Sequence, residues 1–81
     1  MQYNKIKFST EQITESGPVA ANCRSISFSI QTGTATIDNE PLVINQVVSY
    51  NGYPGDLNTT VYKAVLSGGA VLYVKREIEI E

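Results

Sequence analysis

The sequence predicts an all-β protein, a small antiparallel β-sandwich or partly open barrel of six or seven short strands. Val and Ile supply sixteen residues and Thr seven, and such β-branched side chains favour extended backbone. Several segments alternate apolar with polar residues, whereas no window shows the apolar spacing and caps of an amphipathic helix. Residues 1–81 are expected to form a single β domain with a thin core, because short chains bury a small share of their surface.

The first expected strand lies near the N-terminus, where Lys5 and Lys7 alternate with Ile6 and Phe8. Residues 11–22 are the least regular stretch and have Ser, Gly and Pro at their centre. We interpret them as a long connection that crosses from one sheet to the other.

The clearest strand is residues 24–31, in which three large apolar side chains share one face: Ile26, Phe28 and Ile30. Serines occupy the other face, so this strand is expected to be buried on one side and wet on the other. Residues 34–38 alternate again, with Ala35 and Ile37 inward. Residues 38–41 form a turn, since Asp and Asn side chains bond readily to their own backbone.

The second half of the chain offers three more strands. Residues 46–50 are expected to point Val48 and Tyr50 inward, and residues 51–56 form a loop rich in turn formers. A strand over residues 59–66 is followed by Ser-Gly-Gly at 67–69, which predicts a tight hairpin. Residues 71–75 then return as the partner of that strand.

The two ends of the chain are expected to pair with each other. Glu77, Glu79 and Glu81 share one face of the last strand, and Ile78 and Ile80 share the other. Antiparallel pairing of residues 3–8 with 76–81 would set Lys against Glu and Ile or Phe against Ile. Whether this pairing lies within one subunit or between neighbours stays open.

Composition argues against several classes of function. The chain has no His, which is the commonest general base, and its one cysteine, Cys23, cannot form an internal disulfide. A net charge of −2 without a basic run argues against nucleic acid as a partner. No stretch is long and apolar enough to span a bilayer, and residues 1–12 lack the apolar region of a signal peptide. We therefore expect no enzyme activity, no cofactor, no metal site and no membrane partner.

Three tyrosines, Tyr50, Tyr53 and Tyr62, cluster around the predicted loop. Aromatic faces are favoured at protein interfaces and also bind sugars. One alternative is therefore a small carbohydrate- or ligand-binding β-module that uses these tyrosines. A simpler interpretation is that Tyr50 and Tyr62 cap the sandwich with their hydroxyl groups in water.

Five short motifs carry a family resemblance: 34–37 (TATI), Pro41-Leu42, Tyr50-Asn51-Gly52, Thr60-Val61-Tyr62 and Leu72-Tyr73-Val74. Over about residues 26–76 the chain resembles small all-β virion proteins encoded by phages and prophages of Bacteroides-type hosts. It departs from them at Ile44-Asn45, where the family often has Pro-Gly.

The resemblance implies a non-catalytic structural protein of a phage particle, of the capsid decoration, head-fibre or tail-associated type. Such a protein would assemble in the host cytoplasm, locate to the virion, and bind other virion proteins, itself as a homo-oligomer, or both. Interface candidates are Tyr53, Pro54 and Asp56 in the loop and Ile78 and Ile80 in the last strand. Ordinary core packing is the alternative for the two isoleucines.

Overall fold

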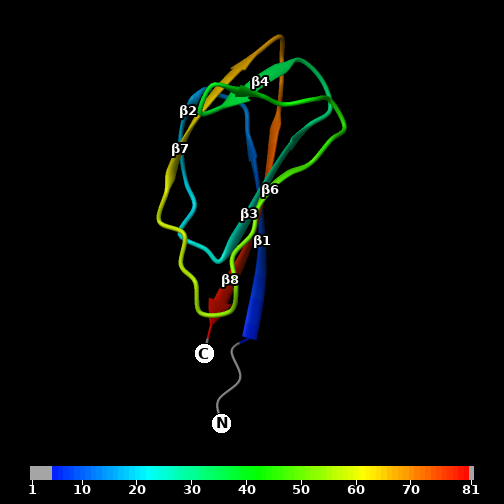
Figure 1. Ribbon diagram of the computed structural model, residues 1–81. Helices are drawn as coiled ribbons and strands as arrows, with labels where there is room; N and C mark the ends of the chain where they lie inside the picture. Colours follow the sequence, from blue (N-terminus) through cyan, green and yellow to red (C-terminus); the bar gives the residue numbers. More distant parts are fainter. Residues whose placement is uncertain (1–4, 81) are drawn as a thin grey trace.

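The computed structural model describes residues 5–80, which form eight strands in two antiparallel sheets packed together (Figure 1). Sheet A has the order β1 (Lys5–Ile13), β8 (Leu72–Ile80), β3 (Ser25–Ile30), β6 (Val48–Tyr50). Sheet B has the order β2 (Gly17–Ala20), β7 (Val61–Ser67), β4 (Thr34–Ile37), β5 (Glu40–Pro41). The predicted small antiparallel β-sandwich is confirmed, and the described residues hold eight strands instead of six or seven.

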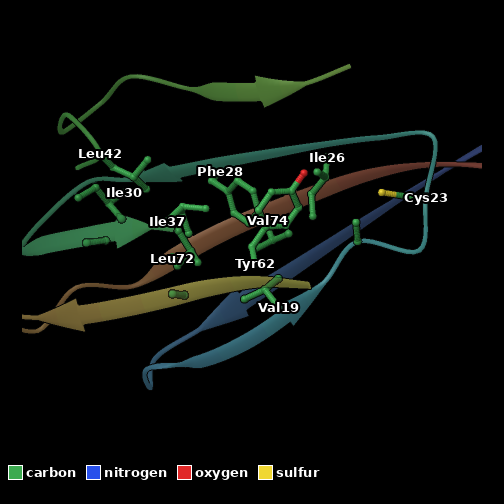
Figure 2. Close-up of a cluster of buried hydrophobic side chains, with 13 residues drawn as sticks. Val19, Cys23, Ile26, Phe28, Ile30, Ile37, Leu42, Tyr62, Leu72 and Val74 are labelled. Atoms are coloured by element: carbon green, nitrogen blue, oxygen red, sulfur yellow. The ribbon is translucent and has the colours of Figure 1, made fainter. Parts of the chain in front are cut away.

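The core lies between the two sheets and is built mainly from inward side chains of β2, β3, β4, β7 and β8 (Figure 2). Alternation assigned Val48 and Tyr50 to the interior, but Val48 is only half-buried and Tyr50 is exposed. The other five side chains assigned to the interior are buried: Ile26, Phe28, Ile30, Ala35 and Ile37. They pack with inward residues of the other strands, among them Val19, Tyr62, Leu72 and Val74. Burial of each large apolar side chain contributes about 1.5–3 kcal/mol relative to exposure, so these alternating positions stabilise the fold substantially.

Short links carry the chain from one sheet to the other. Residues 14–16 join β1 to β2, residues 31–33 join β3 to β4, residues 42–47 join β5 to β6, and residues 68–71 join β7 to β8. Each linked pair therefore stacks across the core. The sandwich consequently has two open sides, one between β1 and β2 and the other between β5 and β6.

The long connection predicted at residues 11–22 is wrong. Residues 11–13 continue β1, a three-residue link crosses to sheet B, and residues 17–20 form β2 before the chain returns to sheet A at β3. Pro18 lies in β2, an edge strand, where its missing N–H costs no interior ladder bond. The turn at residues 38–41 is a two-residue hairpin, since Asp38 and Asn39 have φ of 50° and 70°.

The predicted hairpin at residues 67–69 is wrong. β7 pairs with β2 and β4, whereas β8 pairs with β1 and β3, so the link between β7 and β8 is a corner between the sheets. Gly68 and Gly69 do take positive φ values of 67° and 74°, as a tight turn requires. The chain then enters the core at the buried Ala70, which directs it across to the other sheet.

This corner packs against the β3–β4 corner at Gly33. A Cβ atom on Gly33 would lie 2.7 Å from both the Ala70 nitrogen and the Ser67 oxygen, and the residue has a φ of +73°. The Thr34 and Ser67 hydroxyl groups bond to each other beside it. Glycine is therefore required here for both space and backbone conformation.

We predict that Gly33→Ala lowers the free energy of unfolding by about 2–4 kcal/mol, because it combines a steric clash with backbone strain. Gly17→Ala is the matched control, since a Cβ atom there meets nothing within 4 Å. That control should change stability by less than about 1 kcal/mol. Urea unfolding followed by circular dichroism measures both, and equal stabilities for the two variants would contradict this account of the corner.

The terminal strands β1 and β8 pair antiparallel, as predicted, and they do so within one chain, a point that the sequence left open; the predicted register is wrong. Lys7 lies opposite Ile78, and Phe8 lies opposite Glu77. The register is set at the other end of the ribbon, where Ile13 packs against the core opposite the buried Leu72. Alternation from that pair places each lysine of β1 beside an isoleucine of β8. Residues 3, 4 and 81 of the predicted strands lie outside the described residues.

Arg76 joins the two sheets at the β1/β2 side. Its Nε and Nη2 atoms donate to the Ala20 carbonyl oxygen at 3.2 and 2.9 Å, and its Nη1 atom donates to Glu11 Oε1 at 2.9 Å. One guanidinium thus ties β8 to β1 in its own sheet and to β2 in the other. Charge-assisted bonds of this kind are stronger than neutral ones, so Arg76 fixes how the sheets meet on this side.

Candidate protein-interaction surface

Residues 41–55 contain no Asp, Glu, Lys or Arg, and they follow the β5/β6 side of the sandwich (Figure 1). With Leu57 they carry six of the ten large hydrophobic side chains exposed among residues 5–80: Val43, Ile44, Val47, Tyr50, Tyr53 and Leu57. We call residues 41–55 together with Leu57 the uncharged side. A concentration of exposed apolar groups on a small protein is typical of a binding surface.

The crossing from β5 to β6 is held by backbone hydrogen bonds to strands of both sheets. The Leu42 N–H donates to the Ala35 carbonyl at 2.9 Å, and the Asn45 N–H donates to the Ile30 carbonyl at 2.9 Å. Leu42 is buried, while Asn45 takes a φ of 65° that reverses the chain. These anchors leave Val43 and Ile44 facing outward.

Residues 53–56 form a β-turn at the far end of the uncharged side. The Asp56 N–H donates to the Tyr53 carbonyl at 2.9 Å, and Asp56 Oδ2 accepts from the Tyr53 N–H at 2.8 Å. Pro54 occupies the second position, and Gly55 has a φ of 90° at the third, which is the pattern of a type II turn. The sequence Tyr-Pro-Gly-Asp thus specifies a rigid tip that presents Tyr53.

Hydrogen bonds to β3 and β8 of sheet A hold this loop in place. The Gly52 N–H donates to Ser25 Oγ at 3.0 Å, and the Gly55 N–H donates to Glu79 Oε1 at 2.8 Å. A Cβ atom on Gly52 would lie 2.5 Å from the Arg24 carbonyl oxygen, so only glycine allows this close approach. Backbone bonds between Cys23 and Asn58 hold the end of the loop.

Arg24 links the loop to the end of β8. Its Nη2 and Nη1 atoms lie 3.2 Å from Glu77 Oε2 and Glu79 Oε1 respectively. The hydrogen bond to Glu77, followed by the pairing with Glu79, raises the pKa of Arg24 above its already high value despite partial burial. The glutamates that were expected to face lysines across the terminal strands therefore bind this arginine instead.

A hollow of about 590 Å³ opens between this loop and the end of β6. Its lining includes one cation and one anion, Arg24 and Asp56, among neutral groups: Ser49, Tyr50, Asn51, Gly52, Leu57 and Asn58. It therefore offers polar contacts next to the apolar surface.

The structure does not gather the three tyrosines on one exposed face. Tyr62 is buried, with 6% of its surface exposed, and its hydroxyl oxygen accepts a hydrogen bond from Asn58 Nδ2 at 2.9 Å. Tyr50 stacks on Tyr62 with ring centroids 5.1 Å apart, and both rings meet Phe28 edge-on. Tyr53 is 82% exposed on its turn. Two tyrosines thus build the core edge, and one is presented to solvent.

The five predicted interface candidates fall into two groups. Tyr53, Pro54 and Asp56 are exposed in one turn at the end of the uncharged side. Ile78 and Ile80 lie on the inward face of β8, where Ile78 is partly buried against the core and Ile80 is exposed. Ile78 thus takes the packing role that was its alternative interpretation.

Sequence reasoning missed seven of the ten large apolar residues exposed among residues 5–80, namely Val43, Ile44, Val47, Leu57, Phe8, Val61 and Val65. The signal that could have found the first three was the absence of charge over residues 41–55, which was used only to exclude a membrane span. The exposure of Phe8 was missed because the incorrect register placed an isoleucine opposite it.

The part of the chain that the structure describes offers little support for a metal site or for a membrane-spanning helix. Residues 5–80 contain no group of three or more His, Cys, Asp or Glu that could hold a metal ion. The same residues form no helix with the length and apolar character to cross a bilayer. Comparisons with protein-family models, with curated proteins and with solved structures find no match to this chain.

Burial changes the acidity of two groups near the loop. The pKa of the Cys23 thiol is raised, chiefly by burial, although the nearby Arg76 charge opposes the shift. The pKa of Tyr50 is also raised, first by burial and then by neighbouring groups such as Tyr62. Both side chains therefore hold their protons more tightly in the folded protein than in the unfolded chain.

We predict that the protein loses stability as pH rises. A group with a raised pKa contributes full stability below its unfolded pKa, and this contribution disappears as pH rises through the folded pKa. Thermal melts should therefore be level near neutral pH and fall above about pH 9, where a free thiol ionises. The Cys23→Ala variant should fall less steeply. Identical alkaline profiles for the two proteins would contradict the role of the thiol.

Proposed function

We propose that this protein is a non-catalytic interaction protein that binds another protein through its uncharged side. The supporting observation is the line of exposed apolar side chains along residues 41–57, on a segment with no charge before Asp56. Interface centres are depleted in charge and enriched in tyrosine, as this surface is. Tyr53 and Pro54, expected at an interface from sequence, belong to it.

The fixed conformation of this surface also supports binding. The crossing and the loop are held by hydrogen bonds to Ala35, Ile30, Ser25 and Glu79. A surface that is already ordered loses little conformational entropy when a partner docks, so more of the contact energy appears as affinity. The adjoining hollow would take a polar side chain of the partner between Arg24 and Asp56.

The proposed partner is a second structural protein, with an apolar, weakly charged surface. The resemblance of residues 26–76 to phage virion proteins supports a component of a virus particle, of the capsid decoration, head-fibre or tail-associated type. Binding of a carbohydrate by the three tyrosines has less support, because Tyr62 is buried and its hydroxyl group is bound to Asn58.

The test uses purified products of the genes beside the one that encodes this chain, with binding measured by calorimetry. Val47 is 65% exposed on the uncharged side, so Val47→Asp should weaken binding about tenfold or more, since it buries a charge at the interface. Tyr53→Ala should also weaken binding, because it removes an exposed aromatic anchor.

Val65→Asp is the matched control, because Val65 is 43% exposed on the outer face of sheet B, away from the uncharged side. It should bind like the parent protein. If Val47→Asp and Tyr53→Ala bind normally while Val65→Asp does not, the partner uses a different face. If none of the neighbouring products binds the parent protein, the virion assignment fails.

A further inference from the structure

β1 forms a free edge of sheet A. Within residues 5–80 it pairs with β8 alone, and the pairing is unbroken from Lys5 to Ile13. Its nine residues include no Pro and no Gly, and the continuous register leaves no bulge. Along its outer edge this strand therefore presents backbone N–H and C=O groups that can bond to another strand.

The charges of β1 are complementary to a reversed copy of the same strand. Lys5 and Lys7 lie in its first half, and Glu11 lies in its second half on the same face. Two identical antiparallel strands are related by a two-fold axis normal to the sheet, and residues directly opposite each other share a face. A register centred on Ser9 pairs all nine residues and sets Lys7 opposite Glu11 of the second copy, twice.

Glu11 can contact Lys7 of the second copy while it keeps its ion pair with Arg76. Its Oε1 atom accepts from Arg76, and its side chain is 50% exposed. A carboxylate has a second oxygen, so one glutamate can bind both cations. Lys5 of the second copy would lie diagonally from the same carboxylate and add to the attraction.

Phe8 provides the apolar part of the contact. It is 73% exposed on the outer face of sheet A, where its neighbour on β8 is Glu77. In the register centred on Ser9, Phe8 lies opposite Thr10 of the second copy and diagonal to the second Phe8. Aromatic side chains reach a diagonal neighbour, so the two exposed rings would cover each other.

The arrangement of β2 leaves room for this pairing. β2 turns back from Ile13 and reaches Arg76 at Ala20, so it lies behind the second half of β1, while the first half extends past it (Figure 1). Around an axis at Ser9, the β2 strands of the two copies fall on opposite sides of the axis. The two sheets B therefore do not compete for one position.

We infer that β1 pairs with β1 of a second copy to form a two-fold symmetric dimer with a continuous eight-stranded sheet. β6 lies at the opposite edge of sheet A, so the dimer would display its two uncharged sides at its two ends. Such a dimer would be bivalent if the proposed function holds, but the dimer itself does not depend on that function.

The experiment measures molar mass by light scattering from about 1 µM to about 1 mM protein. The parent protein should approach twice its 8.8 kDa mass as concentration rises. Lys7→Glu should weaken dimerisation about tenfold or more, because it sets two glutamates opposite each other on each side of the axis. Mixing Lys7→Glu with Glu11→Lys should restore the dimer, since each carries the charges that complement the other.

Lys5→Glu is the matched control, because this lysine shares the face of Lys7 but lies opposite the neutral Ile13 of the second copy. It should weaken the dimer less than Lys7→Glu, and thermal melts should show all variants folded. A parent mass of 8.8 kDa at every concentration would overturn the proposed dimer. Lys5 and Lys7 would then serve to prevent the edge of β1 from pairing with another strand. A dimer insensitive to Lys7→Glu, or more sensitive to Lys5→Glu, would overturn the proposed edge or register. Loss of the dimer with normal partner binding would leave the uncharged side unaffected.

Discussion

The position of β8 between β1 and β3 is the constraint on which the rest of this structure depends. Its inward face supplies Leu72 and Val74 to the core and Arg76 to the bonds that join the two sheets. Its outward face supplies Glu77 and Glu79 to Arg24, and Glu79 also accepts from the loop at Gly55. A slip of one residue would exchange the two faces and remove both sets of contacts at once.

The molecule also has two chemically different sides, which lie at opposite edges of the sheet that contains β8. On the β1/β2 side, Lys, Arg and Glu residues surround a long free strand. On the β5/β6 side, residues 41–55 have no charge and expose five large apolar side chains: Val43, Ile44, Val47, Tyr50 and Tyr53. A small sandwich cannot bury every apolar residue, but their concentration on one side is not required by folding. This asymmetry supports the proposed binding function.

Period-two patterning was enough to predict the sandwich and the inward residues of β3 and β4, because each of these two strands has a face of buried apolar side chains. It could not show that residues 68–71 cross between sheets, since both β7 and β8 point apolar residues to the core in either a hairpin or a corner. It also could not fix the register of β1 against β8, because Ile13 and Leu72 at the far end outweigh Lys–Glu attraction near the termini. The candidate site was predicted in part, at Tyr53, Pro54 and Asp56, where turn residues mark an exposed tip. The crossing residues were missed because exposure of Val43 and Val47 depends on backbone anchors far away in sequence.

Nuclear magnetic resonance on isotope-labelled protein tests the register of β8 most directly. Cross-strand contacts between backbone protons identify which residues of β1 and β8 lie opposite each other. The account predicts contacts that join Lys7 with Ile78 and Phe8 with Glu77. Contacts that instead join Lys7 with Glu79 and Phe8 with Ile78 would show the faces of β8 exchanged, and would contradict the account.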